Sequence, residues 1–129
     1  MTLRIIPARF LPHVQGLLRI VTALLFLQHG TAKLFGFPHV AMFDKVTLLS
    51  LLGAAGAIEL VGGFLLLIGL FTRPAAFILA GEMAVAYFGF HAFEAFWPIL
   101  NKGELAALYC FVFLFFSVAG PGKFALDKE

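Results

Sequence analysis

Four residues that can carry a charge or a proton lie inside apolar stretches of the chain: Arg19, His29, Glu59 and Glu82. A carboxylate or an imidazole can accept and release a proton, and a guanidinium can bind a carboxylate through two parallel hydrogen bonds. In an apolar medium each charge is costly unless it is paired, hydrated or neutralised. These residues therefore predict either a network of ion pairs or a proton-handling site.

The composition places these residues in a membrane. Of the 129 residues, 62% are hydrophobic and only 12% are charged, and the mean hydropathy is +1.02. Soluble domains contain about 45–50% apolar and about 25% charged residues. The net charge of +2 is spread along the chain, which argues against nucleic acid as a partner. Cys110 is the only cysteine, so the chain has no internal disulfide and no CxxC redox pair.

The elements that must position the charged residues are four apolar stretches. Each approaches the length of about 20 residues that a membrane-spanning helix needs. The expected spans are residues 13–32, 48–70, 74–92 and 104–119. Glycine and proline clusters separate them. We therefore expect an all-α fold in one domain, residues 1–129, built as a bundle of four transmembrane helices that binds the lipid bilayer.

The distribution of basic residues predicts the orientation of this bundle. Five basic residues lie on the side that carries both termini, against three on the other. The first set is Arg4, Arg9, Arg73, Lys123 and Lys128, and the second is Lys33, Lys45 and Lys102. Because cytoplasmic loops carry the excess of Lys and Arg, both termini are expected in the cytoplasm.

Depth estimates bring three of the charged residues into one layer. At a rise of about 1.5 Å per residue, Arg19, Glu82 and Glu59 lie about 9, 12 and 16 Å from the cytoplasmic end. Arg19 is expected to pair with one carboxylate, and the other glutamate must then be protonated, hydrated or paired with His29. The alternative is that Arg19 and one glutamate form a purely structural ion pair.

Small residues indicate that both glutamates face other helices. Helix backbones approach closely in lipid where glycine and alanine share a face. Glu59 shares its helical face with Ala55 and Gly63, and Glu82 shares its face with Ala86 and Gly89.

A second polar layer is expected near the outer boundary of the membrane. It contains His29, Lys33 one turn later, and His91, which shares a helical stripe with Tyr87. Lys33 can also extend to the membrane surface. No HxxH, HExxH or ExxH spacing occurs, so no metal site is expected. The remaining polar residues are most simply a solvated loop: Glu94, Asn101, Lys102 and Glu104.

Three segments carry motifs of a known family. Residues 18–36 contain an arginine, then His29-Gly30, Lys33 and a closing glycine; residues 59–73 read E-L-V-G-G-F-L-L-L-I-G-L-F-T-R; residues 101–127 run from N-K-G-E to G-P-G-K-F-A-L-D. Together these segments resemble the DoxX family of small bacterial membrane proteins over nearly the whole chain. Ala125 stands where the family usually has serine.

The resemblance implies a multi-pass protein of the bacterial cytoplasmic (inner) membrane. Some relatives are linked to thiosulfate:quinone oxidoreductase and others to membrane complexes that handle thiols or oxidative stress. Our leading hypothesis is a quinone- or quinol-interacting subunit of a membrane redox system, and so an oxidoreductase subunit. In this hypothesis Arg19, His29, Lys33 and His91 bind the quinone, and His29, Glu59 and Glu82 handle protons.

Two other functions compete with this hypothesis. The first is a non-catalytic membrane subunit that forms homo-oligomers or holds a soluble redox partner protein. It requires only ion pairs and small-residue contacts. The second is a small transporter or proton pathway.

Overall fold

The chain folds entirely into helices. A computed structural model describes residues 2–128, and no strand occurs within that range. Four long helices make up most of it: α1 (Leu11–Phe35), α2 (Leu51–Ile68), α3 (Thr72–Ala86) and α5 (Glu104–Ala119). The shorter elements are the 3-10 helices η1 (Ala8–Phe10) and η2 (Ala41–Phe43), the π-helical turn η3 (Tyr87–His91) and α4 (Pro98–Asn101). The expected all-α class is confirmed.

Helix lengths agree only partly with the expected spans. α5 coincides with residues 104–119, but α1 is longer than 13–32, α2 is shorter than 48–70, and α3 gives way to the π-helical turn before residue 92. Two helical segments, Ala8–Phe35 and Leu51–Ile68, are long and apolar enough to cross a membrane. α3 has 15 residues and α5 has 16. The π-helical turn follows α3 directly, and together they form a continuous helical segment from Thr72 to His91.

Local sequence signals define where α1 and α2 begin and end. The hydroxyl of Ser50 accepts a hydrogen bond of 3.0 Å from the backbone N–H of Gly53, which caps the first turn of α2. Gly36 and Gly69 follow α1 and α2 in the left-handed conformation, with φ of 69° and 68°. Glycine adopts this conformation without steric cost, so both helices end there.

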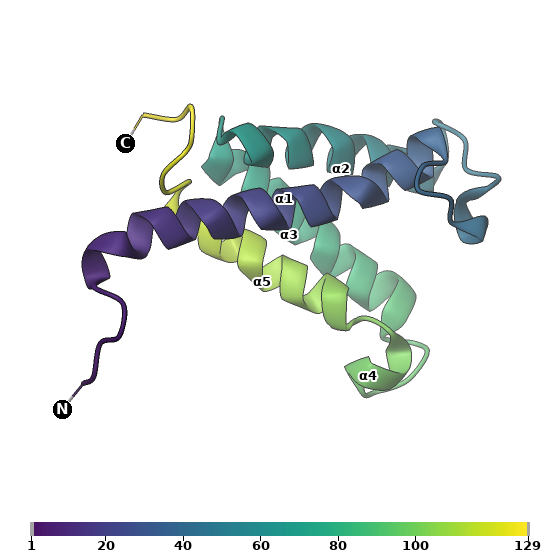
Figure 1. Cartoon of the computed structure of the whole chain (residues 1–129). Coiled ribbons are helices and arrows are strands. Elements are labelled where there is room, and N and C mark those ends of the chain that lie inside the picture. Colours follow the sequence, from purple (N-terminus) through teal and green to yellow (C-terminus); the bar gives the residue numbers. More distant parts are fainter. Residues whose placement is uncertain (1, 129) are drawn as a thin grey trace.

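The helices pack as two antiparallel pairs. α1 lies along α2, and α3 lies along α5 (Figure 1). The short turn at Gly69–Phe71 joins the pairs by bringing α3 back against α2. The N-terminal and C-terminal segments lie at the same end of the helices, whereas η2 and α4 lie toward the other end (Figure 1).

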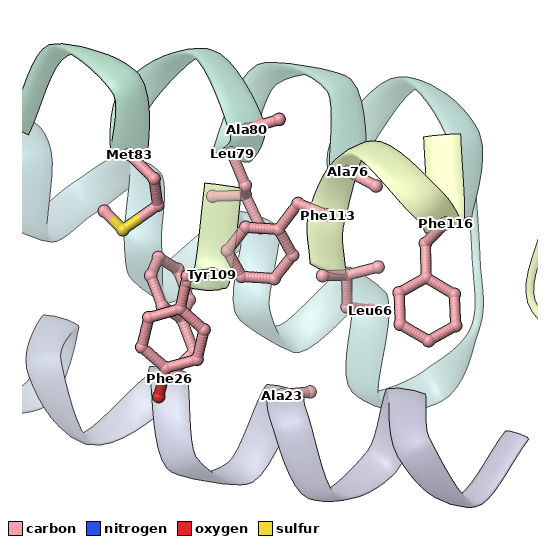
Figure 2. Packing of buried hydrophobic residues seen from close by; sticks show 10 residues of the cluster. All are labelled: Ala23, Phe26, Leu66, Ala76, Leu79, Ala80, Met83, Tyr109, Phe113 and Phe116. Atoms are coloured by element: carbon pink, nitrogen blue, oxygen red, sulfur yellow. The ribbon is translucent and has the colours of Figure 1, made fainter. Parts of the chain in front are cut away.

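An aromatic core holds the two pairs together. All four long helices contribute to it (Figure 2). The ring of Phe26 on α1 meets Tyr109 and Phe113 on α5 edge to face, at centroid distances of 5.2 and 4.9 Å. These rings fill the space between α1 and α5, so they determine how far apart the pairs sit. The cluster consists of Ala23, Phe26, Leu66, Ala76, Leu79, Ala80, Met83, Tyr109, Phe113 and Phe116.

Candidate functional site

A buried ion pair joins α1 to α2. The ammonium Nζ of Lys33 lies 2.6 Å from Oε1 and 2.8 Å from Oε2 of Glu59. Only 10% of the Lys33 side chain and 2% of the Glu59 side chain are exposed. The ring of Phe43 in η2 covers the ammonium, with 5.3 Å between Nζ and the ring centroid. Lys33 therefore turns inward to Glu59 and does not extend to the membrane surface.

Two glycines allow this ion pair to form. A Cβ atom at Gly30 would lie 2.9 Å from the backbone nitrogen of Leu60 and 3.0 Å from the carbonyl oxygen of Gly56. A Cβ atom at Gly56 would lie 3.0 Å from that of Lys33. The two helix backbones approach closely here because neither glycine has a side chain. Glu59 lies on the packed side of its helix, as its small-residue face predicted.

Glu82 reaches this ion pair from α3. Its carboxyl group interacts with that of Glu59 and lies within electrostatic range of Lys33. Oε1 of Glu82 is buried and has no hydrogen-bonding partner among residues 2–128. Two ionised carboxylates offer only acceptors, so their contact becomes a hydrogen bond only when one of them carries a proton.

His29 and Tyr109 bring two more unpartnered polar atoms to the same region. The rings meet at right angles with 6.1 Å between centroids, and His29 lies within electrostatic range of Lys33 and Glu59. Nε2 of His29 and the Tyr109 hydroxyl are buried without a partner in the described part of the chain. The hydroxyl of Tyr109 points toward α1 (Figure 2).

These five residues form what we call the buried polar cluster: His29, Lys33, Glu59, Glu82 and Tyr109. Buried polar groups in proteins nearly always have partners, so three unpartnered atoms in one region make this cluster the candidate site. Tyr109 was not among the predicted site residues. The only sign of it in the sequence is a hydroxyl within the last apolar stretch.

The expected pairing of Arg19 with a glutamate is wrong. Arg19 is fully buried, and its guanidinium donates to four backbone carbonyls. Nε binds the carbonyl of Leu66 at 2.8 Å, and the two terminal nitrogens bind Pro121, Lys123 and Phe124. Arg19 therefore lies at the level where α2 and α5 end, away from the glutamates. The depth estimate failed because α1 begins well before its neighbours.

The C-terminal tail that Arg19 holds also caps α3. The carboxylate of Asp127 accepts hydrogen bonds of 2.9 Å from the backbone N–H groups of Phe71 and Thr72. Burial acts to raise the pKa of Asp127, but these bonds and the charge of Arg19 outweigh it and hold the pKa below its usual value. The hydrogen bonds that an N-cap side chain usually accepts are thus accepted here by a residue near the other end of the chain.

His91 belongs to a different network from the buried polar cluster. Its Nδ1 lies 3.0 Å from the carbonyl oxygen of Asn101. The side chain of Asn101 is buried, donates to the Tyr87 hydroxyl and the Ala95 carbonyl, and accepts from Gly103. Asn101 is therefore not the solvated loop residue that we expected.

Of the helical stripes expected near the end of α3, one is kept, because the rings of Tyr87 and His91 remain neighbours with 6.5 Å between centroids, and the other is changed. The π-helical turn adds a residue to the helix turn from Tyr87 to His91, so the regular spacing beyond Ala86 is lost. A Cβ atom at Gly89 would meet nothing within 4 Å. Gly89 therefore does not form a packed face with Glu82.

Apolar grooves on the surface include one beside α5 and one between α2 and α3, and no residue of the buried polar cluster lines either of them. The groove between α2 and α3 has a volume of about 360 Å³. Gly62 and Leu79 in its wall lie one turn from Glu59 and Glu82 respectively. The groove therefore follows the contact between α2 and α3 that also carries these two glutamates, which we call the acid pair. Its lining residues are Ala57, Ile58, Val61, Gly62, Leu65, Ala75, Ile78 and Leu79. Within residues 2–128 no three histidine, cysteine, aspartate or glutamate side chains are grouped to hold a metal ion.

The fold and the cluster together define a class of protein. Large apolar side chains cover the outside of α1, where Leu17, Val21 and Leu24 are each more than half exposed. Charged side chains, in contrast, are buried between the helices. An apolar exterior around a charged interior is the arrangement of an integral membrane protein.

The chain belongs to the DoxX family, whose model matches residues 15–92. The resemblance inferred from the motifs is thereby confirmed. An uncharacterized protein of Haemophilus influenzae is 46% identical over 130 aligned positions, which cover 94% of this chain and 93% of the relative. An uncharacterized membrane protein of Mycobacterium tuberculosis is 31% identical, and the alignment covers 87% of this chain and 78% of the relative. No solved structure matches the chain.

Proposed function

We propose that this protein is a quinone- or quinol-interacting subunit of a bacterial membrane redox system. The observation that supports the proposal is the group of three buried atoms without partners: Nε2 of His29, Oε1 of Glu82 and the hydroxyl of Tyr109. A quinone head group presents carbonyl oxygens that need hydrogen-bond donors, and its reduction consumes protons. The imidazole and the phenol can donate, and the carboxyl group of Glu82 can hold a proton.

The apolar part of such a ligand fits the groove between α2 and α3. The groove is within the size range of small-molecule sites. Because its walls lie on the same two helices as Glu59 and Glu82, an apolar chain in the groove would direct an attached head group toward the acid pair. When bound, a quinone would carry two electrons and two protons. The chain would supply hydrogen-bond donors, a proton and an apolar groove.

The proposal includes four crossings of the cytoplasmic membrane with both termini inside. The continuous helical segment Thr72–His91 spans about 30 Å at the usual helical rise, which is the thickness of the hydrocarbon layer. α5 is shorter, and the four residues of α4 come directly before it in the chain. Both chain ends lie at one end of the helices, as an even number of crossings requires (Figure 1).

Binding of a short-chain ubiquinone analogue to the purified protein in detergent tests the function. Calorimetric titration should show saturable binding to the wild type. Tyr109→Phe removes one donor and should weaken binding about tenfold, the cost of one hydrogen bond. His29→Ala should weaken it at least as much.

Tyr87→Phe is the matched control, because it removes a hydroxyl that belongs to the Asn101 network. It should leave the affinity unchanged. The proposal fails if the wild type does not bind the analogue, or if Tyr109→Phe and Tyr87→Phe bind it equally well.

A second candidate function is a non-catalytic membrane subunit that holds a soluble partner protein or a second copy of itself. The ion pair of Lys33 with Glu59 favours it, since this pair is already complete and can simply lock α1 to α2. No quinone binding, together with a stoichiometric protein that co-purifies with the chain, would support this alternative.

A further inference from the structure

Three charged side chains from three different helices meet in the buried polar cluster. Lys33 on α1 binds both oxygens of Glu59 on α2. Glu82 on α3 lies beside Glu59, because α2 and α3 pack closely one turn away, where a Cβ atom at Gly62 would lie 2.8 Å from Cδ2 of Leu79. The side chains of the ion pair are almost completely buried. Bulk water screens charges weakly at this depth, so they have to be balanced largely within the cluster.

Counting charges shows an imbalance of one. If all three groups were ionised, one ammonium would face two carboxylates and leave a net negative charge in the apolar interior. The other titratable group facing them is His29 on α1, whose ring in turn meets that of Tyr109 on α5. Two carboxylates in contact share a proton readily, because the proton removes their repulsion and makes an O–H···O hydrogen bond.

We propose that Glu59 and Glu82 share a single exchangeable proton opposite a charged Lys33. In this state the three groups have no net charge. Glu82 is the proton donor in the O–H···O contact, because both oxygens of Glu59 already accept from the ammonium. Releasing the proton leaves two carboxylates beside Lys33, and taking it back restores neutrality. The cluster is thus a proton-binding site inside the membrane, and it requires no quinone.

Infrared spectroscopy of the purified protein tests this proposal directly. A protonated carboxyl group has a carbonyl stretching band that an ionised carboxylate lacks. The wild type at neutral pH, in a detergent without ester groups, should show one such band, and transfer to D₂O should shift it. A wild-type spectrum without this band overturns the proposal, whatever the variants show.

Three variants separate a shared proton from a glutamate that is neutral simply because it is buried. Glu82→Gln should abolish the band. Glu59→Gln should abolish it as well, because Glu82 would then ionise and pair with Lys33. Lys33→Met removes the cation, so both glutamates should become protonated and the band should roughly double. Retention of the full band in Glu59→Gln would show that the proton belongs to Glu82 alone and would contradict sharing.

Glu104→Gln is the control, since Glu104 is exposed at the start of α5. It should leave the band unchanged. The infrared result is independent of ligand binding, so failure of the quinone titration and failure of the shared proton are distinguishable. Circular dichroism of each variant should show an unchanged helical content.

Discussion

Arg19 shows how a single residue can organise a chain end. Its planar guanidinium donates in several directions at once, and four carbonyls from α2 and the tail surround it. Each of these hydrogen bonds involves a charge and is stronger than one between neutral groups. The sequence predicted a carboxylate partner for Arg19. Arg19 instead donates to backbone carbonyls near the ends of two helices, where backbone N–H donors are missing.

Replacing Arg19 should release the C-terminal tail. Arg19→Met should destabilise the protein by about 3 kcal/mol or more, because several buried carbonyls lose a charged donor. Arg19→Lys should recover only part of this loss, since an ammonium cannot reach all four carbonyls. Thermal unfolding in detergent measures the stability.

Limited trypsin digestion measures release of the tail itself. Cleavage after Lys123 should be faster in Arg19→Met than in the wild type, because the tail then leaves the helices. Equal cleavage rates would mean that other contacts, such as the bonds to Asp127, hold the tail without Arg19.

At the scale of the elements, the contact between α1 and α2 determines the geometry of the cluster. The backbones meet where Gly30 faces Gly56. That approach carries Lys33 into the reach of Glu59. The small-residue pattern predicted this packed face correctly, because close approach depends on residue size and helical spacing alone. The partner of Glu59 depends on the position of α1 along α2. This position cannot be predicted from the sequence alone.

A methyl group at this contact should disturb the cluster. Gly30→Ala places a Cβ atom 2.9 Å from the Leu60 nitrogen, so α1 and α2 must separate. We expect a loss of about 1–3 kcal/mol, the usual cost of overpacking. The infrared band of the shared proton should change as well.

Gly81→Ala is the matched control on α3. A Cβ atom there meets nothing within 4 Å. The substitution should be neutral or stabilise the protein by up to about 1 kcal/mol, because alanine favours the helix. Thermal unfolding measures the stability of Gly30→Ala and Gly81→Ala. Equal stabilities would contradict the importance of the α1–α2 contact.

For the whole molecule, the two helix pairs enclose charge within an apolar exterior. The tail closes one end through Arg19 and Asp127, and η2 covers Lys33 toward the other. The buried polar cluster therefore lies between two closed ends. In the proposed function a ligand approaches from the side, along the groove between α2 and α3.

Reporter fusions test the four proposed crossings. Green fluorescent protein fused to either terminus should fluoresce, and alkaline phosphatase there should be inactive, because the proposed topology places both ends in the cytoplasm. Phosphatase inserted after residue 40 or after residue 95 should be active. An active phosphatase at one terminus only would indicate an odd number of crossings and contradict the topology.

The sequence alone determined the class of the fold, the family and the presence of costly buried charges. These properties follow from composition, helical spacing and local turn signals, all of which act over a few residues. Only the tertiary structure decided the partners: Lys33 and not Arg19 meets Glu59, Tyr109 joins the cluster, and His91 does not. Partner choice depends on how the helices are positioned along one another and on a tail more than 100 residues from Arg19, and both arise from packing of the whole chain.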